Sequence, residues 1–112
     1  MKDVADLGCS GPITLSANGK AAEEWPGLLG RYVATGEAHE GAAVYRKSHE
    51  GNLYRHSDGT WNVCKYGIGG GSGNIRSIDT AECPASIRQW QYSNAIVAMF
   101  SGDIRAQCSV HT

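Results

Sequence analysis

The sequence predicts an all-β protein, a compact antiparallel sandwich or barrel-like fold of about eight short strands held by two disulfides. Short runs of β-branched and aromatic residues are separated by turn signals at roughly the eight- to twelve-residue spacing of such folds. Fifteen glycines in 112 residues indicate many turns and few long helices. Four cysteines in so short a chain suggest a disulfide framework.

The best-defined stretch is 43–66, which reads as a three-stranded antiparallel meander. Asp58-Gly59 favours a two-residue type I′ turn, which would set His56 opposite Trp61 and Tyr54 opposite Val63. The turn at 48–51 returns the preceding strand against this hairpin, although a one-residue slip there would exchange its faces. The faces expected for the second hairpin are Tyr54, His56, Trp61 and Val63 on one side and Leu53, Arg55, Asn62 and Cys64 on the other.

The remaining elements follow from alternation and from glycine and proline. Before the meander we expect a flexible tail at 1–8, a strand at 11–16, a turn at 17–20, one helical turn at 21–25, a strand at 28–35 and a loop at 36–41. After it we expect a flexible glycine-rich loop at 67–74, a strand at 75–78, a loop at 79–85, a strand at 86–92, a buried strand (or short helix) at 94–100, a turn at 101–103 and a closing strand at 104–108. Residues 9–112 would form one domain.

Charge and hydrophobicity limit the classes of partner. Ten Lys plus Arg against eleven Asp plus Glu give a net charge of −1, which does not favour nucleic acid. No apolar run approaches the roughly 20 residues of a membrane span. The N-terminus lacks the apolar region of a signal peptide, but Met1 could be a start codon placed before a mature sequence.

The cysteine positions favour the pair Cys9–Cys108, which would tie the two ends together, and Cys64–Cys83, which would close the glycine-rich loop. The other two pairings stay open. In the chain-entropy model the shorter link contributes about 3 kcal/mol and the longer about 5 kcal/mol. Zinc is disfavoured because no C-x-x-C or H-x-x-x-H spacing occurs. Disulfides imply a secreted or extracellular protein.

Several segments, in their order along residues 9–109, resemble a small secreted cysteine-containing β-module of extracellular proteins from marine invertebrates and protists. The segments are Gly30-Arg31-Tyr32, Val44-Tyr45-Arg46, Leu53-Tyr54, Ser57 to Trp61, Arg76-Ser77, Cys83 to Ser86, Trp90-Gln91-Tyr92 and Cys108. The resemblance implies a secreted interaction domain without a named activity. A Trp that the pattern places near 97–99 is missing from this chain.

Aromatic and polar residues supply the candidate binding site. Sugar rings stack on aromatic rings, while amide, guanidinium and carboxylate groups bond the hydroxyls. Trp61 and Trp90 are expected in the core, because with a single Phe the Trp and Tyr side chains must fill much of it. The predicted ligand-binding residues are Trp25, Tyr66, Asn74, Arg76 and Asp79.

The pairs His39-Glu40 and His49-Glu50, with Arg46, Arg55 and His56, offer the base, acid and cation of a secreted nuclease. Each pair falls in an expected turn, so solvated turn residues are the favoured interpretation and no catalytic residue is predicted. Asp58, Asp79 and Asp103 could ligate Ca²⁺, but no D-x-D-x-D loop joins them, so no cofactor is predicted.

These observations lead to a functional prediction with two alternatives. The predicted function is a secreted, non-enzymatic, lectin-like module that binds carbohydrate through loop-borne aromatic and polar residues. The first alternative is a protein–protein or matrix module, for which a homodimer through the sheet face of Leu53, Arg55 and Asn62 is compatible with the sequence. The second is a small nuclease-type hydrolase.

Overall fold

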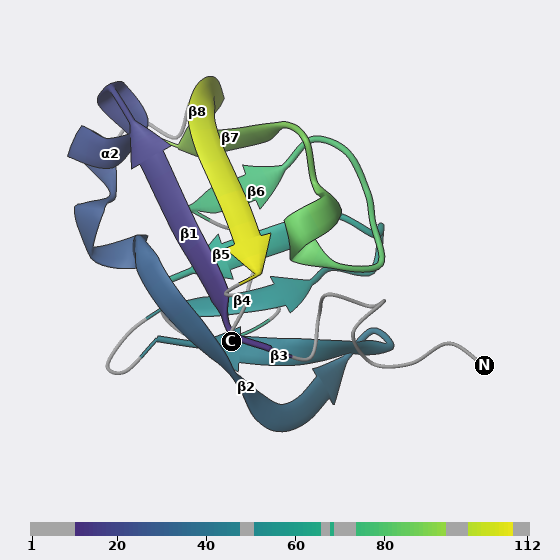
Figure 1. The fold of residues 1–112 in the computed structure, drawn as a ribbon. Coiled ribbons are helices and arrows are strands. Elements are labelled where there is room, and N and C mark those ends of the chain that lie inside the picture. Colours follow the sequence, from purple (N-terminus) through teal and green to yellow (C-terminus); the bar gives the residue numbers. More distant parts are fainter. Residues whose placement is uncertain (1–10, 48–50, 66–67, 69–73, 94–98, 109–112) are drawn as a thin grey trace.

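The computed structural model describes residues 11–47, 51–65, 68, 74–93 and 99–108. In these residues eight antiparallel strands follow one another around a closed barrel, and the last strand pairs with the first (Figure 1). The strands are β1 Ile13–Asn18, β2 Gly30–His39, β3 Ala42–Arg46, β4 Asn52–Arg55, β5 Trp61–Cys64, β6 Ile75–Ser77, β7 Trp90–Ser93 and β8 Met99–Cys108. Between them lie the helix α2 Lys20–Glu24 and the 3₁₀ turns η1 Pro26–Leu28 and η2 Pro84–Ser86. The all-β prediction is confirmed, and the architecture is the barrel.

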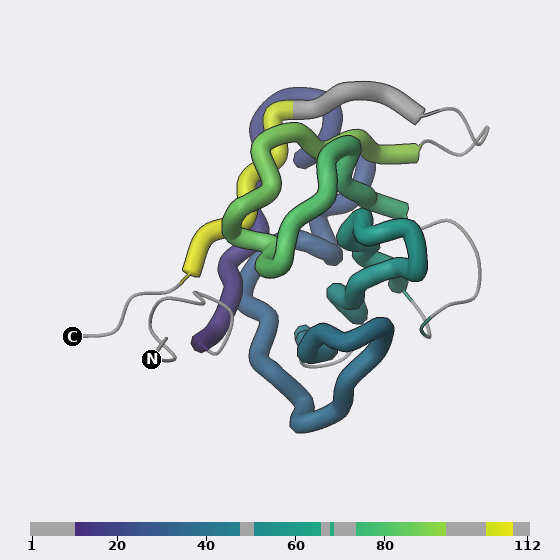
Figure 2. The backbone as a smooth tube through the Cα atoms, turned by 90° about the vertical axis from the view of Figure 1, so that its right-hand side faces the viewer, coloured from purple at the N-terminus to yellow at the C-terminus, as the bar shows by residue number. Residues whose placement is uncertain are grey.

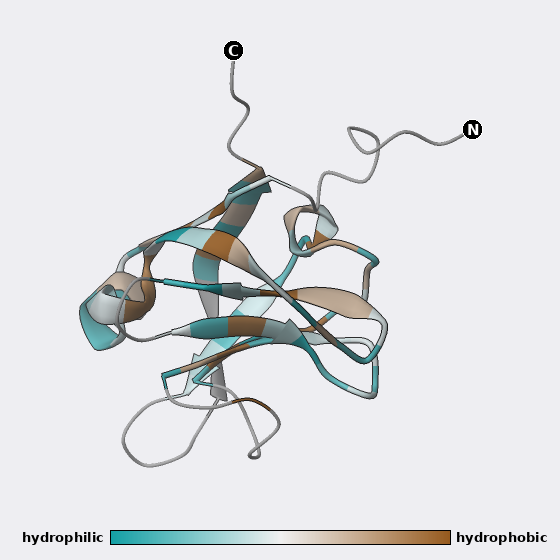
Figure 3. Cartoon of the chain, turned by 90° about the horizontal axis from the view of Figure 1, so that it is seen from below, coloured by the Kyte–Doolittle hydropathy of each residue, from teal (hydrophilic) through white to brown (hydrophobic). Residues whose placement is uncertain are grey.

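The barrel interior is built by alternation along the strands, because successive side chains of a strand point to opposite faces. Leu53, Val63 and Ile75 are cross-strand neighbours on β4, β5 and β6, and all three are fully buried. Apolar and polar stretches accordingly alternate along the strands in Figure 3. Trp61 and Trp90 are buried in the same cluster, which confirms their predicted place in the core.

Short covering segments lie at opposite ends of strands β6 and β7 (Figures 1 and 2). At one end, α2 and η1 insert Ala21 and Leu28 into the core, and Trp25 bonds Ser93 at the end of β7. At the other end, the loop from Ile78 to Gln89 contains η2 and inserts Ile87 into the core. The predicted helical turn near Ala21 is confirmed as α2.

The predicted register of the β4–β5 hairpin is wrong by one residue. Arg55, not His56, lies opposite Trp61, and the loop comprises residues 57–59. The His56 carbonyl accepts from the Gly59 N–H, and the Asp58 carboxylate accepts from the N–H and the hydroxyl of Thr60. Gly59 has a φ of 90° but Asp58 has no positive φ, so this is a three-residue loop and not a type I′ turn.

The slip rearranges the faces that were expected for this hairpin, because strand side chains alternate with period two. Leu53, Trp61 and Val63 line the core, whereas Tyr54 lies opposite Asn62 on the outer face. Two consecutive positive-φ residues do occur at Glu40 and Gly41, in the tight β2–β3 turn that follows His39.

Three other boundaries differ from expectation. β2 runs through the predicted loop at 36–41 as far as His39, with a register shift after Ala34. The strand expected at 86–92 begins only at Trp90, because η2 occupies its start. The turn expected at 101–103 lies within the ten-residue strand β8, which pairs with β7 up to Gly102 and with β1 from Asp103. Of the buried strand expected at 94–100, residues 94–98 lie outside the described residues, and Met99 and Phe100 begin β8.

Both predicted disulfide pairs are wrong. Cys64 is a free buried thiol whose Sγ lies 3.2 Å from the Tyr54 hydroxyl oxygen. Cys108 also carries a thiol, and burial raises its pKa. No disulfide joins two cysteines of the described residues. Cys9 lies outside them.

The position of Cys64 explains why it does not pair with Cys83. Cys64 ends β5 beside Lys65, which bonds Asn74, whereas Cys83 directly precedes η2 near the opposite end of the barrel. The Asn74 side chain, and not a disulfide, holds the two ends of the glycine-rich segment together: its Oδ1 accepts from the Lys65 N–H at 2.9 Å.

Candidate functional site

Two of the five predicted binding residues meet at Ser93, the last residue of β7. The Trp25 indole Nε1 donates to the Ser93 carbonyl oxygen at 2.6 Å. The Asn74 carbonyl oxygen accepts from the Ser93 N–H at 2.9 Å. Tyr66 follows Lys65 in the sequence and lies outside the described residues. Trp25 and Asn74 are therefore neighbours at the α2 end of the barrel.

Arg76 lies on the outer face of the barrel, two residues after Asn74 in the sequence. Its flanking residues Ile75 and Ser77 are buried, so the Arg76 side chain faces outward. In register, Asn62 of β5 lies on one side of Arg76 and Gln91 of β7 on the other. We call the outward-facing set Asn62, Asn74, Arg76, Gln91 and Ser93 the outer strip.

The residues of the outer strip differ in exposure. Asn62 is only 1% exposed, and its amide nitrogen lies 3.3 Å from the Thr60 hydroxyl oxygen. Arg76 and Gln91 are half-buried. Asn62 therefore lies beneath the exposed surface of the strip, whereas Arg76 and Gln91 are partly exposed to solvent.

The Arg76 guanidinium has no hydrogen bond or ion pair to any residue in the described part of the chain. The positive charge of Arg76 affects the pKa of an acidic group, the Asp58 carboxyl. Hydrogen bonds from the side chain and then the backbone of Thr60 lower the pKa of the Asp58 carboxyl, and the charges of His56 and Arg76 add to this effect. The Asp58 carboxylate bonds Thr60 and lies 3.5 Å from His56 Nδ1, and it forms no ion pair with Arg76.

Asp79 lies away from the other candidates and has a structural role at the η2 end. Its two carboxylate oxygens accept from the backbone N–H groups of Arg88 and Gln89 at 3.0 and 3.1 Å. Burial alone would raise the pKa of the Asp79 carboxyl, but these two hydrogen bonds outweigh burial and hold that pKa below its usual value. The structure does not bring Asp79 to the outer strip.

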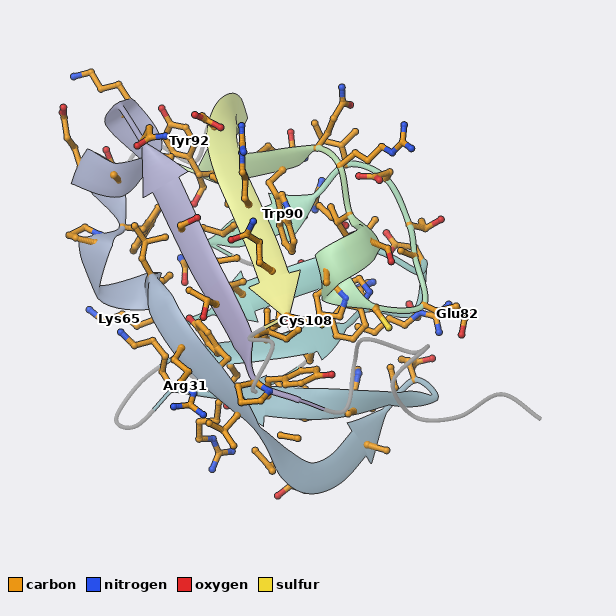
Figure 4. The ribbon with its side chains drawn as sticks, in the orientation of Figure 1. Arg31, Lys65, Glu82, Trp90, Tyr92 and Cys108 are labelled. Atoms are coloured by element: carbon orange, nitrogen blue, oxygen red, sulfur yellow. The ribbon has the colours of Figure 1, made fainter. Side chains whose placement is uncertain are left out.

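The described aromatic side chains offer little exposed surface. Trp25 is half-buried, and the others are at most 7% exposed: Tyr32, Tyr45, Tyr54, Trp61, Trp90 and Tyr92. Figure 4 shows Trp90 and Tyr92 projecting from β7 into the barrel. Within the described side chains, Trp25 is thus the aromatic residue with a ring still available to a ligand.

The two described histidines, His39 and His56, do not assemble the acid, base and cation of a nuclease. His39 Nδ1 lies 2.8 Å from the Arg55 carbonyl oxygen, which can only accept, and the ring packs edge-on against Tyr54. His56 lies 3.5 Å from an Asp58 carboxylate oxygen at a turn. His49 and Glu50 lie outside the described residues.

The aspartates considered for Ca²⁺ are separated. Asp58 bonds Thr60, Asp79 bonds the backbone near Arg88, and Asp103 accepts from the Asn18 amide at 2.9 Å. Across the described ranges, no group of three or more His, Cys, Asp or Glu side chains could hold a metal ion.

Sequence reasoning missed Gln91 and Ser93. Each is an ordinary polar residue of an alternating strand, and the sequence carries no separate signal for it. The register is what places Gln91 beside Arg76, and register across the 12 residues between β6 and β7 depends on how the η2 loop folds.

Comparison with protein-family models, with curated proteins and with solved structures finds no match to this chain. The resemblance to secreted β-modules therefore remains an expectation from the sequence. In the part of the chain that the structure describes, no helix has the length and apolar character to cross a membrane.

Proposed function

We propose that this protein is a non-enzymatic recognition module that binds carbohydrate along the outer strip, between Trp25 and Arg76. The observation that carries the proposal is the half-buried Arg76 guanidinium, which the described residues leave without a hydrogen-bond partner between two side-chain amides. None of the described residues uses the donors of this guanidinium, and their number and planar arrangement suit a ligand with several acceptor oxygens.

The chemistry of the strip suits a polyhydroxylated ligand. Arg76 supplies up to five N–H donors, and the Gln91 amide supplies both donors and an acceptor. The Trp25 Nε1 bonds Ser93, which fixes the indole, and the half-buried side chain keeps part of its surface exposed for packing against a sugar C–H surface. This is a small set of fixed polar groups beside an aromatic residue, as carbohydrate sites require.

A protein-docking surface has less support. Among described residues the large exposed apolar side chains are Val33 on β2 at 50% and Ile78 after β6 at 45%, on separate parts of the barrel. Leu53, which was expected on the face considered for a dimer, lies in the core instead. A polar ligand fits the described surface better than an apolar partner.

The proposed function is ligand recognition, and it does not depend on where the protein is located. Secretion was expected from two disulfides, and because Cys64 and Cys108 are free thiols, neither predicted pair supports it. A secreted lectin-like module remains the form in which we propose the function, with the resemblance as its support.

The test is a glycan array with the purified chain, with and without Ca²⁺, followed by ¹⁵N NMR titration of each hit. We expect saccharide-dependent shifts at Arg76, Gln91 and Ser93. The double variant Arg76→Ala/Gln91→Ala should lose binding. The matched control is Arg31→Ala/Gln107→Ala, which removes an exposed Arg and Gln that both lie opposite Thr14 on another wall.

Two results would overturn the proposal. One is a blank array together with no shifts for mono- and oligosaccharides at millimolar concentration. The other is saccharide binding that the Arg31→Ala/Gln107→Ala control abolishes and the strip variant leaves intact.

A further inference from the structure

The charge of Arg76 distinguishes the outer strip from a site for neutral sugars. The other members of the strip are amides or a hydroxyl, so Arg76 is its single charged group. Arg76 is half-buried, and no described carboxylate forms an ion pair with its guanidinium. A ligand that brings its own anion would therefore gain more here than a neutral ligand of the same shape.

The guanidinium also limits the geometry of that anion. Arg presents its donors as a planar fork that pairs two parallel N–H groups with the two oxygens of a carboxylate. Gln91, in register beside Arg76, can bond groups next to the carboxylate but adds no charge.

The strip also limits how many negative charges the ligand can carry. The strip offers one cation, the Asp58 carboxylate lies close enough for its pKa to respond to Arg76, and the whole chain has a net charge of −1. A densely sulfated chain would place several further anions near Asp58 without partners. A sugar with one carboxylate per ring matches the strip better.

Resting on the proposed carbohydrate function, we propose that the outer strip selects a uronic-acid-containing saccharide, with its carboxylate held by the Arg76 guanidinium. Gln91 and Asn74 bond the neighbouring hydroxyls. The Asn62 amide, which is buried beneath the strip, is a positioning group and does not touch the ligand.

Isothermal titration with three probes tests this inference: trigalacturonic acid, its methyl ester and a carrageenan tetrasaccharide, which is sulfated and contains no uronic acid. The ester keeps the shape of the acid and removes its charge. We expect the wild-type protein to bind the acid about tenfold or more tightly than the ester, as a charge-assisted pair predicts. The carrageenan probe should bind no more tightly than the acid.

The variants locate the carboxylate contact. Arg76→Gln should lower the affinity for the acid to that of the ester, while leaving the affinity for the ester nearly unchanged. Arg76→Lys keeps the charge without the fork and should fall between the two. Arg31→Gln, on the opposite wall, should change neither affinity. Thermal unfolding of each variant checks that the barrel is intact.

The failures can be told apart. Equal binding of acid and ester, or much tighter binding of the carrageenan probe, overturns the uronate inference and leaves a neutral-sugar or sulfate-binding module. Loss of acid binding in Arg31→Gln but not in Arg76→Gln places the charge contact elsewhere and also overturns it. No binding of any of the three probes, together with a blank glycan array, overturns the proposed function itself.

Discussion

At the scale of single residues, Gly51 shows how closely the barrel wall is packed. Gly51 has a φ of 100°, and a Cβ built on it would lie 2.7 Å from the Tyr32 hydroxyl oxygen. Tyr32 cannot move away easily, because its ring is fully buried and its hydroxyl donates to the Leu28 carbonyl at 2.6 Å. The position therefore requires glycine for two separate reasons: backbone conformation and space.

Gly51→Ala and Gly41→Ala separate these two reasons. Gly41 has a φ of 77° but nothing within 4 Å of an added Cβ, so its substitution reports backbone strain alone. We expect Gly41→Ala to lower the free energy of unfolding by about 1–2 kcal/mol. Gly51→Ala should lower it by about 2 kcal/mol more, since overpacking adds to strain.

Urea unfolding followed by tryptophan fluorescence measures both values. Tyr32→Phe removes the hydroxyl and should make Gly51→Ala less costly in the double variant than in the single one. Equal losses for Gly41→Ala and Gly51→Ala would contradict the packing argument.

At the scale of elements, the loop from Ile78 to Gln89 is held by side chains that the sequence pattern does not single out. The Asp79 carboxylate bonds the N–H groups of Arg88 and Gln89, and the Trp61 indole donates to the Ala81 carbonyl at 3.0 Å. These bonds fix both ends and the middle of the loop. The loop in turn places η2 and Ile87 against the core.

Asp79→Asn should loosen this loop. An amide keeps the size of the carboxylate but offers one acceptor oxygen, so one backbone N–H loses its partner at a cost of about 1 kcal/mol. Amide hydrogen exchange should accelerate at Ser86 and Ile87, whose N–H groups bond within η2. Asp103→Asn, the same change on β8, should leave exchange at η2 unchanged.

The effect of Asp79→Asn should depend on pH. The pKa of the folded-state Asp79 carboxyl is lowered from its ordinary value of 3.8, so its stabilisation is complete above that value. That stabilisation is lost as the pH falls through the folded-state pKa. The difference in unfolding free energy between wild type and variant should thus be constant at neutral pH and shrink below about pH 4. A difference that grows on acidification would contradict the assignment.

The elements also show what sequence patterns can and cannot predict. The alternation of apolar and polar residues predicts β4, β5 and the core positions of Trp61 and Trp90, because a strand with one buried face carries apolar residues at every second position. It does not predict the register at Arg55 and Trp61. That register follows from the Asp58 carboxylate bonding Thr60, which makes a longer loop than the Asp-Gly pair suggests.

The same limit applies to the candidate site. Trp25, Asn74 and Arg76 were predicted from residue type near the glycine-rich segment, and the structure places all three near or on one strip. Asp79 has the same residue chemistry but lies at the other end of β6, where it bonds Arg88 and Gln89. The direction of each strand, and not composition, decides which of these side chains can share a ligand.

At the scale of the whole molecule, closure of the barrel links all eight strands. β8 pairs with β7 over its first part and with β1 over its second, so every strand has two neighbours. The wall carrying the outer strip, β5 to β7, is therefore stabilised partly through the distant seam between β1 and β8. The rigidity of a site at Arg76 depends on that seam.

Leu15→Ala tests this dependence. Leu15 is 1% exposed on β1, between Gly30 of β2 and Ala106 of β8. Truncating a buried leucine costs about 2–5 kcal/mol, a large share of the roughly 5–15 kcal/mol that stabilises a domain. Because the barrel is closed, we expect β4 and β5 to unfold together with β1, at one lower urea concentration. Val33→Ala, at an exposed site on β2, should change the midpoint little.

Hydrogen exchange across the urea transition gives the measurement. Protection of the Leu53 and Val63 amides on the far wall should be lost in Leu15→Ala at the same urea concentration as protection of β1. If the far wall stays protected after β1 has exchanged, the strands from β4 to β7 form an independent unit. In that case the outer strip would keep its geometry without the seam, and Leu15→Ala would leave any saccharide binding at Arg76 intact.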